Sequence, residues 1–292
     1  MKPNRRLTPY LFVAPAVLVF GFAVLLPVVM TGVYSFTDWD GFGPKVFVGL
    51  DNYRKAANDT LFRQSFVHVA IYIAATLVLE VLVGLLLAGF VSAKPRGSLW
   101  FRVAIFTPVM LPLVVVGILW SFVYNADFGL LNASLSAVGL DSLGHVWLGD
   151  TSTALLAICV VSGWVFAGFY MTIFYAAFSQ IPLDTIEAAV LDGASQWRIF
   201  RLVKVPMIRS ARNVSILLCV TGGFQGFDLF FVMTNGGPYN STEIPTTYLV
   251  RQVFGFGNVG YGSAMAVVLT AVVMVLGVLT LRLSRTPVRA RA

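Results

Sequence analysis

Unbroken blocks of about twenty apolar residues limit what this chain can fold into more than any other feature of its sequence. An α-helix needs about twenty residues to cross about 30 Å of hydrocarbon. In hydrocarbon each backbone N–H and C=O needs a partner within the protein, so only helices and closed barrels can span it. Barrel strands alternate apolar and polar residues, and these blocks do not. The sequence therefore predicts an all-α integral membrane protein with six transmembrane helices, at about 11–36, 67–92, 102–124, 154–176, 213–233 and 263–282.

The composition agrees with this class and argues against a separate soluble domain. Of the 292 residues, 58% are hydrophobic and 11% are charged, whereas a soluble domain carries about 25% charged residues. We expect a single transmembrane domain over residues 1–292. The first block is too long for a signal peptide and ends without a small-residue cleavage site, so it should remain as a membrane helix. Proline should bend the first span, at Pro15 and Pro27, and bend or break the third, at Pro108 and Pro112.

The net charge of +7 arises from basic residues that gather on one predicted side of the membrane. The other side holds only Lys45, Arg54, Lys55, Arg63 and Arg251. The first side has both ends of the chain and the loops near 93–101 and 177–212, and its basic residues are Lys2, Arg5, Arg6, Lys94, Arg96, Arg102, Arg198, Arg201, Lys204, Arg209, Arg212, Arg282, Arg285, Arg289 and Arg291. Because cytoplasmic loops carry the excess of Lys and Arg, both termini should face the cytoplasm. The charge thus indicates topology, and no basic soluble domain is evident that would bind nucleic acid.

The cytoplasmic loop at 177–212 contains a segment, 181–194, that is unlike its surroundings. Asp184 followed by Glu187 has the spacing of a helix N-cap and its reciprocal partner. Gly193 is suited to end that helix, because glycine adopts left-handed backbone angles without a Cβ clash. A helix of about two turns does not persist alone in water, so it needs a surface to pack against.

A second helix should follow, capped by Ser195 and ending near Pro206. It carries apolar and basic side chains together: Trp197, Arg198, Phe200, Arg201, Leu202, Val203 and Lys204. Such a segment can lie on anionic lipid at the membrane surface or pack on protein, and the sequence leaves both readings open. The first helix has no basic residue and a small face at Ala188 and Ala189, which favours insertion into a cleft of a protein partner.

This loop resembles the EAA loop of binding-protein-dependent ABC importer permeases. The matching residues are Glu187, Ala188, Ala189, Asp192, Gly193, Ala194, Phe200 and Pro206. Val203 and Arg209 depart from the family pattern, in which Ile and a second Pro are common. In that family the loop forms a coupling helix that sits in a groove of a separate ATPase subunit. The resemblance implies the same role for the matching residues from Glu187 to Ala194.

Further segments resemble the carbohydrate-uptake subgroup of these permeases, which is akin to maltose and multiple-sugar systems. They include 49–53, 226–230, 234–238 and 260–264, and the resemblance covers essentially the whole chain. It implies a type I ABC importer permease fold. It also implies a channel subunit that moves a sugar, such as an oligosaccharide or a related carbohydrate. Polyols and glycerol-phosphate-type solutes remain alternatives within the family.

The resemblance also implies that the chain lies in the bacterial cytoplasmic membrane and works with partners. They are a second, homologous permease, two ATPase subunits and an extracytoplasmic solute-binding protein. The chain has no GxxxxGK[ST] phosphate loop, so the ATPase subunits would use the ATP and Mg²⁺, and this chain would bind no cofactor. We therefore expect a transporter subunit and not an enzyme.

Polar residues within or next to the spans are candidates for the solute pathway. A charge in mid-bilayer costs roughly 2.5–3.5 kcal/mol, so Glu80 and Asp228 should face protein or water. Gln225, Asn125 and Tyr170 are candidates on the same reasoning. For each acid, a hydrogen bond that only joins two helices is the alternative.

Other functions have less support in the sequence. An ion-driven secondary transporter should show inverted repeats and paired intramembrane carboxylates, but no repeat is evident and the two acids have unlike surroundings. A membrane enzyme would need a cluster of titratable groups or a complete nucleophile elbow. No metal site is expected, because His68 and His145 stand alone and Cys159 and Cys219 suit buried apolar positions.

Overall fold

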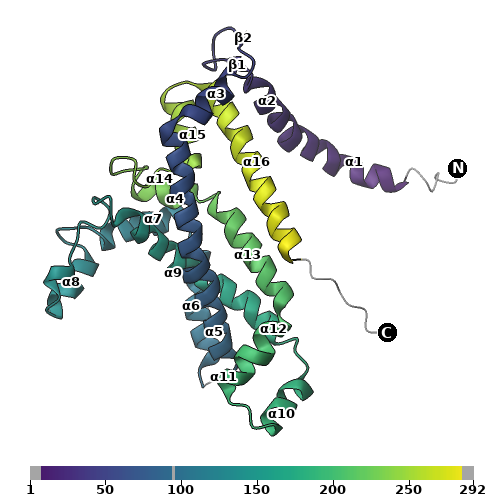
Figure 1. Ribbon diagram of the computed structural model, residues 1–292, viewed down its shortest axis with the longest axis vertical. Coiled ribbons are helices and arrows are strands. Elements are labelled where there is room, and N and C mark those ends of the chain that lie inside the picture. The colour runs from purple at the N-terminus through teal and green to yellow at the C-terminus, as the bar shows by residue number, and fades with distance from the viewer. Residues whose placement is uncertain (1–7, 94–95, 285–292) are drawn as a thin grey trace. The chain divides into compact units, whose positions relative to one another are not determined.

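The computed structural model describes residues 8–93 and 96–284, which form helices and one short hairpin (Figure 1). The hairpin strands, β1 (Thr37–Asp38) and β2 (Val46–Phe47), are antiparallel, with Thr37 opposite Phe47. In chain order the helices are α1 (Thr8–Phe20), η1 (Gly21–Leu25), α2 (Leu26–Tyr34), α3 (Asp51–Asn58), α4 (Thr60–Thr76), η2 (Leu77–Leu82), α5 (Val83–Ser92), α6 (Ser98–Phe106), η3 (Thr107–Met110), α7 (Leu113–Val123), α8 (Leu130–Ala137), η4 (Asp141–Leu143), α9 (Ala154–Phe178), α10 (Leu183–Leu191), α11 (Gln196–Ile199), η5 (Phe200–Lys204), α12 (Val205–Met207), α13 (Arg209–Gly223), α14 (Phe227–Met233), α15 (Pro245–Val250), η6 (Arg251–Gly255) and α16 (Val259–Ser284).

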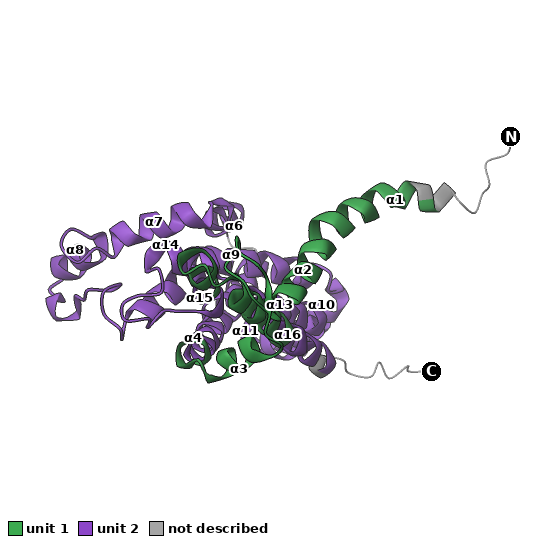
Figure 2. Cartoon of the chain, turned by 90° about the horizontal axis from the view of Figure 1, so that it is seen from above, with its two compact units in different colours: residues 1–63, 249–272 green, residues 64–248, 273–292 purple. Residues whose placement is uncertain are grey.

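The chain divides into two compact units (Figure 2). The first takes in residues 1–63 and 249–272, and the second takes in 64–248 and 273–292. Each unit thus combines segments that are far apart in the sequence. A single domain over the whole chain stays a prediction. Some basic residues used to predict topology lie outside the described residues: Lys2, Arg5, Arg6, Lys94, Arg285, Arg289 and Arg291.

The helices that are long and apolar enough to cross a membrane match the predicted blocks. Within the described residues, four of them are continuous: Phe12–Tyr34, Thr60–Ser92, Ala154–Phe178 and Val259–Arg282. Two bent helix pairs complete the set, Ser98–Met110 with Leu113–Val123, and Arg209–Gly223 with Phe227–Met233. When each bent pair is counted as one span, the structure has the six spans that the sequence predicts.

Proline has different effects in the first and third spans. In the third span, Pro108 lies in η3 and Pro112 directly precedes α7, and the two helices of the pair are bent by 100°. Proline has no N–H and its ring clashes with the preceding turn, so the predicted break is confirmed. The first span stays continuous, and the π-helical stretch η1 lies just before Pro27. Such π turns accompany an interrupted hydrogen-bond ladder within a helix.

The second span begins earlier than its apolar block predicts, at Thr60. Asp59 caps it, because its Oδ1 accepts hydrogen bonds from the backbone N–H groups of Leu61 and Phe62 at 2.9 and 3.0 Å. A carboxylate there satisfies N–H groups that the first helical turn leaves unpaired. The Tyr261 hydroxyl donates to the other Asp59 oxygen at 2.7 Å. This start is polar, so apolarity alone does not reveal it.

Helix α9 is the most deeply buried of the continuous spans, with 72% of its most apolar stretch inside the protein. It contacts η2, α5, α6, η3, α13 and α14 of the same unit. Glycine allows these close approaches. A Cβ at Gly84 of α5 would lie 2.8 Å from Tyr170 Cβ, and a Cβ at Gly168 of α9 would collide with the carbonyl oxygen of Ile105. Backbone-to-backbone contact at small residues is the usual way for membrane helices to pack.

We therefore expect Gly168→Ala to destabilise the protein by about 1–3 kcal/mol, because the added methyl group displaces backbone atoms instead of a flexible side chain. Thermal unfolding of the purified protein in mild detergent would show a lower midpoint. Gly277→Ala in α16 is the matched control, since a Cβ there meets nothing within 4 Å. Equal midpoints for the two variants would show that the contact between Gly168 and Ile105 is not tight.

Candidate functional site

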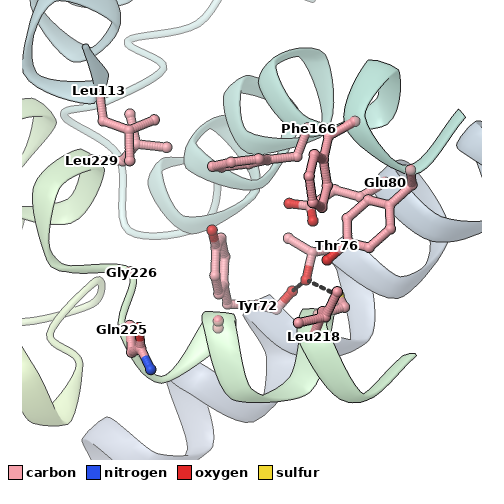
Figure 3. Close-up of a pocket in the computed structure, with 14 residues that line it drawn as sticks. Tyr72, Thr76, Glu80, Leu113, Phe166, Leu218, Gln225, Gly226 and Leu229 are labelled. Atoms are coloured by element: carbon pink, nitrogen blue, oxygen red, sulfur yellow. Dashed lines mark hydrogen bonds between the residues drawn. The ribbon is translucent and has the colours of Figure 1, made fainter. Parts of the chain in front are cut away.

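A cavity of about 340 Å³ opens among helices of the second unit (Figure 3). Its walls come from α4, η2, α7, α9, α13 and α14 and from the break between the last two. In Figure 3, Leu113 and Leu229 lie on one side of it and Thr76 and Glu80 lie on the other. The cavity is large enough to hold a small ligand. It is therefore the candidate ligand site in this unit.

One wall of the cavity is polar and comes from a single face of the second span. Tyr72, Thr76 and Glu80 are four residues apart, and this spacing places them on the same helical face. Glu80 is only 5% exposed. A buried carboxyl group in a span is costly unless it is hydrogen-bonded, so its partners decide whether it is tolerated.

Ser162 of α9 supplies the hydrogen bonds for this wall. Its Oγ donates to Glu80 Oε1 at 2.7 Å and lies 2.7 Å from the Tyr72 hydroxyl. Because the Ser162 proton goes to Glu80, the Tyr72 hydroxyl donates to Ser162. The three side chains thus form one directed chain between two spans. This agrees with the alternative for Glu80 in which its hydrogen bond joins two helices, and it leaves the acid at the cavity wall.

The facing walls are mostly aromatic and small. Phe166, Phe169 and Tyr170 of α9 line the cavity, and the rings of Phe169 and Tyr170 meet edge to face with centroids 5.3 Å apart. Gly222 and Gly223 of α13 line the other side, where they add no side chain to the cavity. Flat apolar rings beside a few polar groups can hold a ligand that is apolar on its faces and polar at its edges.

Gln225 lies in the non-helical break between α13 and α14, where the span bends by 44°. Its side chain is exposed, and the structure gives its amide group no hydrogen bond among the described residues. It lines the same cavity. A free amide both donates and accepts, so it can bind a hydroxyl group in either direction.

The structure brings together three of the five predicted pathway residues. Glu80, Tyr170 and Gln225 line one cavity. Asp228 is half-buried in the first turn of α14 and lies outside the lining. Asn125 also lies outside it, and its Oδ1 accepts from the backbone N–H groups of the two residues at 127 and 128, which closes the turn after α7. A role in the solute pathway stays a prediction for all five.

Sequence reasoning did not find Tyr72, Thr76 or Ser162. The four-residue spacing of the first two with Glu80 is a signal that was available, because three polar groups on one face of an otherwise apolar helix need a polar neighbour. Ser162 carries no such signal, since a serine in a membrane helix usually bonds to its own backbone. Cys159 and Cys219 are both buried, as predicted, but Cys219 also borders the cavity, and its Sγ lies 3.5 Å from the Thr76 hydroxyl group.

The predicted two-turn helix exists as α10, but its first residues differ from the expectation. Asp184 is not the N-cap. Pro182 holds that position, and no side chain caps the helix. Proline is well suited to a helix start because its missing N–H would have no partner there. Asp184 lies in the first turn instead, where its negative charge interacts favourably with the helix dipole.

The end of α10 is as predicted. Gly193 has a φ of +75°, its N–H donates to the Val190 carbonyl at 2.9 Å, and the Ala194 N–H donates to the Ala189 carbonyl at 3.0 Å. This pair of bonds is a Schellman motif. Ser195 then caps the next helix, with its Oγ accepting from the Arg198 N–H at 3.4 Å. That helical stretch ends at Met207, next to Pro206, which also confirms the prediction.

Helix α10 buries none of its side chains, although several are large and apolar. Leu183 is 65% exposed and Leu191 is 88% exposed. The face at Ala188 and Ala189 is also largely open. Helix α10 has nine residues, a fixed C-terminal end at Gly193 and apolar side chains that no other part of the described chain covers. Such an exposed apolar surface is typical of a site that binds another protein.

Comparison with known proteins gives the same class throughout. Residues 80–286 match the family model described as binding-protein-dependent transport system inner membrane component. The chain is 34% identical to a probable ABC transporter permease of Bacillus subtilis, YurN, over 98% of this chain and 99% of that protein. It is 32% identical to AmyD of Thermoanaerobacterium thermosulfurigenes, a probable permease for starch degradation products, over 94% and 93% of the two chains.

A solved structure matches at the level of the fold. It is a bacterial alginate ABC transporter in complex with a periplasmic protein that holds an alginate pentasaccharide. The TM-score is 0.86, and the match covers 97% of this chain and 95% of the other at 18% identity. This likeness confirms the predicted ABC importer permease fold.

Ser162 is the hydrogen-bond partner that Glu80 and Tyr72 share, so replacing it should lower the protein's free energy of unfolding. We expect Ser162→Ala to lower its stability by about 1–2 kcal/mol, because Glu80 and Tyr72 each lose a buried hydrogen-bond partner. The melting midpoint in detergent would report this. Ser121→Ala is the control, since the Ser121 Oγ bonds only to the Gly117 carbonyl of its own helix at 2.9 Å. If both variants melted together, the chain through Ser162 would contribute nothing to stability.

Proposed function

This chain belongs to the family of binding-protein-dependent transport system inner membrane components, and we propose that it forms part of the pathway for a sugar in an ABC importer. Members of this family are membrane transport components. The chain is accordingly a permease of the inner membrane and not an enzyme.

The cavity in the second unit carries the proposal. It combines the polar wall of Tyr72, Thr76 and Glu80 with the aromatic rings of α9 and the free amide of Gln225. A sugar has hydroxyl groups around its edge and weakly polar C–H groups on its faces. Hydrogen bonds can hold the edge while an aromatic ring contacts a face. Glu80, Tyr170 and Gln225 are therefore proposed as pathway residues, and Asp228 and Asn125 as residues outside the binding cavity.

The solute proposed is an oligosaccharide or a related carbohydrate. Support comes from the relative named for starch degradation products and from the alginate transporter that shares the fold. A polyol-type solute is the second candidate, because another relative, 33% identical, is named for osmoprotective compounds. Both classes present many hydroxyl groups, so direct uptake measurements must separate them.

Coupling to ATP is proposed to run through α10. Its exposed apolar residues and the small face at Ala188 and Ala189 would insert into a groove of an ATPase subunit, with Glu187 and Asp192 at its rim. The Schellman motif at Gly193 keeps the helix short and rigid, so a movement of the partner would shift α10 as one body. Two ATPase subunits would bind the ATP and Mg²⁺, a second permease would complete the pathway, and an extracytoplasmic binding protein would deliver the solute.

The orientation proposed has both termini in the cytoplasm. The loop that contains α10 must then lie on the cytoplasmic side, where an ATPase has access to ATP. The described basic residues of that loop, among them Arg198, Arg201 and Arg209, agree with this orientation. A reporter fused to either terminus would test it, since a cytoplasmic and a periplasmic reporter give opposite signals.

Gly193→Pro should separate the permease from its ATPase. Proline holds φ near −65°, which is incompatible with the φ of +75° at this position, so the end of α10 must unwind. We expect membrane insertion to be normal and recovery of the ATPase by affinity purification of the tagged chain to be lost. Gly139→Pro is the control, because Gly139 has a φ of +77° in a loop on the predicted outer side. Full ATPase recovery with Gly193→Pro would disprove the docking role.

Gln225→Ala should slow solute uptake without affecting assembly. Loss of one hydrogen bond to a neutral hydroxyl group corresponds to about a two- to tenfold decrease in apparent affinity. Uptake of labelled oligosaccharides, a polyol and a glycerol phosphodiester by vesicles that contain the complete complex would measure it. Gln180→Ala, at an exposed turn after α9, should leave uptake unchanged. Uptake that needed an ion gradient instead of ATP would contradict the importer assignment.

A further inference from the structure

A second cavity, of about 290 Å³, lies where the second span meets the helical stretch from Gln196 to Met207. One wall is the last two turns of α5, with Leu86, Gly89 and Phe90, and the residue that follows the helix, Ala93. The other wall carries Gln196, Trp197, Phe200 and Lys204. A Cβ at Gly89 would lie 2.5 Å from the Phe200 ring, so glycine is what allows this ring to rest on α5. The cavity is thus a built part of the fold.

Lys204 places a positive charge in this cavity without a negative partner. The residue is only 9% exposed, and its Nζ donates to Ser92 Oγ, a neutral acceptor, at 2.9 Å. Among the described residues no carboxylate forms an ion pair with Lys204, and the other group near its Nζ is the uncharged Phe178 ring, with its centroid at 5.9 Å. Burial lowers the pKa of Lys204. An ammonium group has three N–H donors, so an anion in the cavity would find donors available.

The position of the cavity relative to the span indicates the kind of anion. The span ends at Ser92, so Lys204 lies at the depth where hydrocarbon gives way to lipid headgroups. Leu86 and Phe90, which lie within the span before its end at Ser92, are 43% and 56% exposed. Trp197, on the opposite wall, is 60% exposed. Aromatic residues at this depth are typical of the membrane interface.

We propose that this cavity binds an anionic phospholipid, with its phosphate on Lys204 and an acyl chain along Leu86 and Phe90. Charge complementarity and the continuous apolar surface of the span both favour a lipid over a segment of protein. The basic helix after Ser195 thereby serves as a lipid site, while α10 remains available for the protein partner. This inference does not depend on which solute is carried.

The test is a lipid titration of the complete complex, delipidated in mild detergent and followed by native mass spectrometry. The Kd of phosphatidylglycerol should be at least about fivefold lower than that of phosphatidylcholine with the same acyl chains. One well-placed cation contributes about that factor to the binding of an anionic lipid. Lys204→Gln should remove the preference, and Lys204→Arg should retain it. Ala93→Leu, which narrows the cavity without changing charge, should weaken binding of both lipids.

Arg209→Gln is the matched control, since Arg209 is exposed, basic and absent from the lining. If it reduced the preference as much as Lys204→Gln, general surface charge would explain the binding. Displacement of the lipid by glycerol 3-phosphate would indicate a site for soluble phosphate. Binding only after the partner subunits are removed would show that a protein fills the cavity. Each of these results would overturn the proposal. If Lys204→Gln fails to assemble, the other two variants still test it, because Lys204→Arg should keep the preference for the anionic lipid and Ala93→Leu should weaken binding of both lipids.

Discussion

The close contact of α9 with its neighbours is the interaction on which the second unit depends. Glycine at 84 and 168 lets α5 and the end of α6 approach until backbone meets backbone. At that distance the side chains on either side of each contact must interlock, so the positions of Ser162, Phe166 and Tyr170 are fixed by packing before any ligand arrives. The cavity is what remains where the helix is interrupted at 224–226, between α13 and α14, and can no longer fill the space. Tight packing thus follows from the glycines at 84 and 168, and the open site follows from the break between α13 and α14.

The buried acid illustrates how such a structure tolerates polarity. Glu80 accepts a hydrogen bond from the Ser162 hydroxyl group of α9, and Ser162 in turn accepts from Tyr72, which lies on the same span as Glu80. The hydrogen bonds from Tyr72 to Ser162 and from Ser162 to Glu80 therefore join two helices and also give the cavity one polar wall. The hydrogen bond from Ser162 to Oε1 is compatible with the pathway role that is proposed for Glu80, because the residue still borders the cavity.

Much of the fold could be predicted from the sequence, because a lipid environment leaves few choices. Apolar length determined the spans, and Pro108 and Pro112 located the break in the third. Gly193 and Ser195 located the ends of two helices, since each acts through its own backbone neighbourhood. Asp184 was wrongly predicted as an N-cap because the preceding proline fills that position equally well, and spacing alone cannot rank the two. The cavity could not be predicted, because Tyr72 and Ser162 are ninety residues apart and meet only through tertiary packing.

The 100° bend before α7 has a mechanical consequence. A continuous α-helix passes a displacement along its axis from one end to the other, because its hydrogen bonds resist stretching. The third span cannot do so, since Leu111 and Pro112 interrupt the ladder between η3 and α7. A push on α6 would change the angle at these two residues before it moved α7. The span then acts as a joint and not as a rod, and Leu113, the first residue beyond the joint, borders the cavity at the point where a change of angle would alter its width.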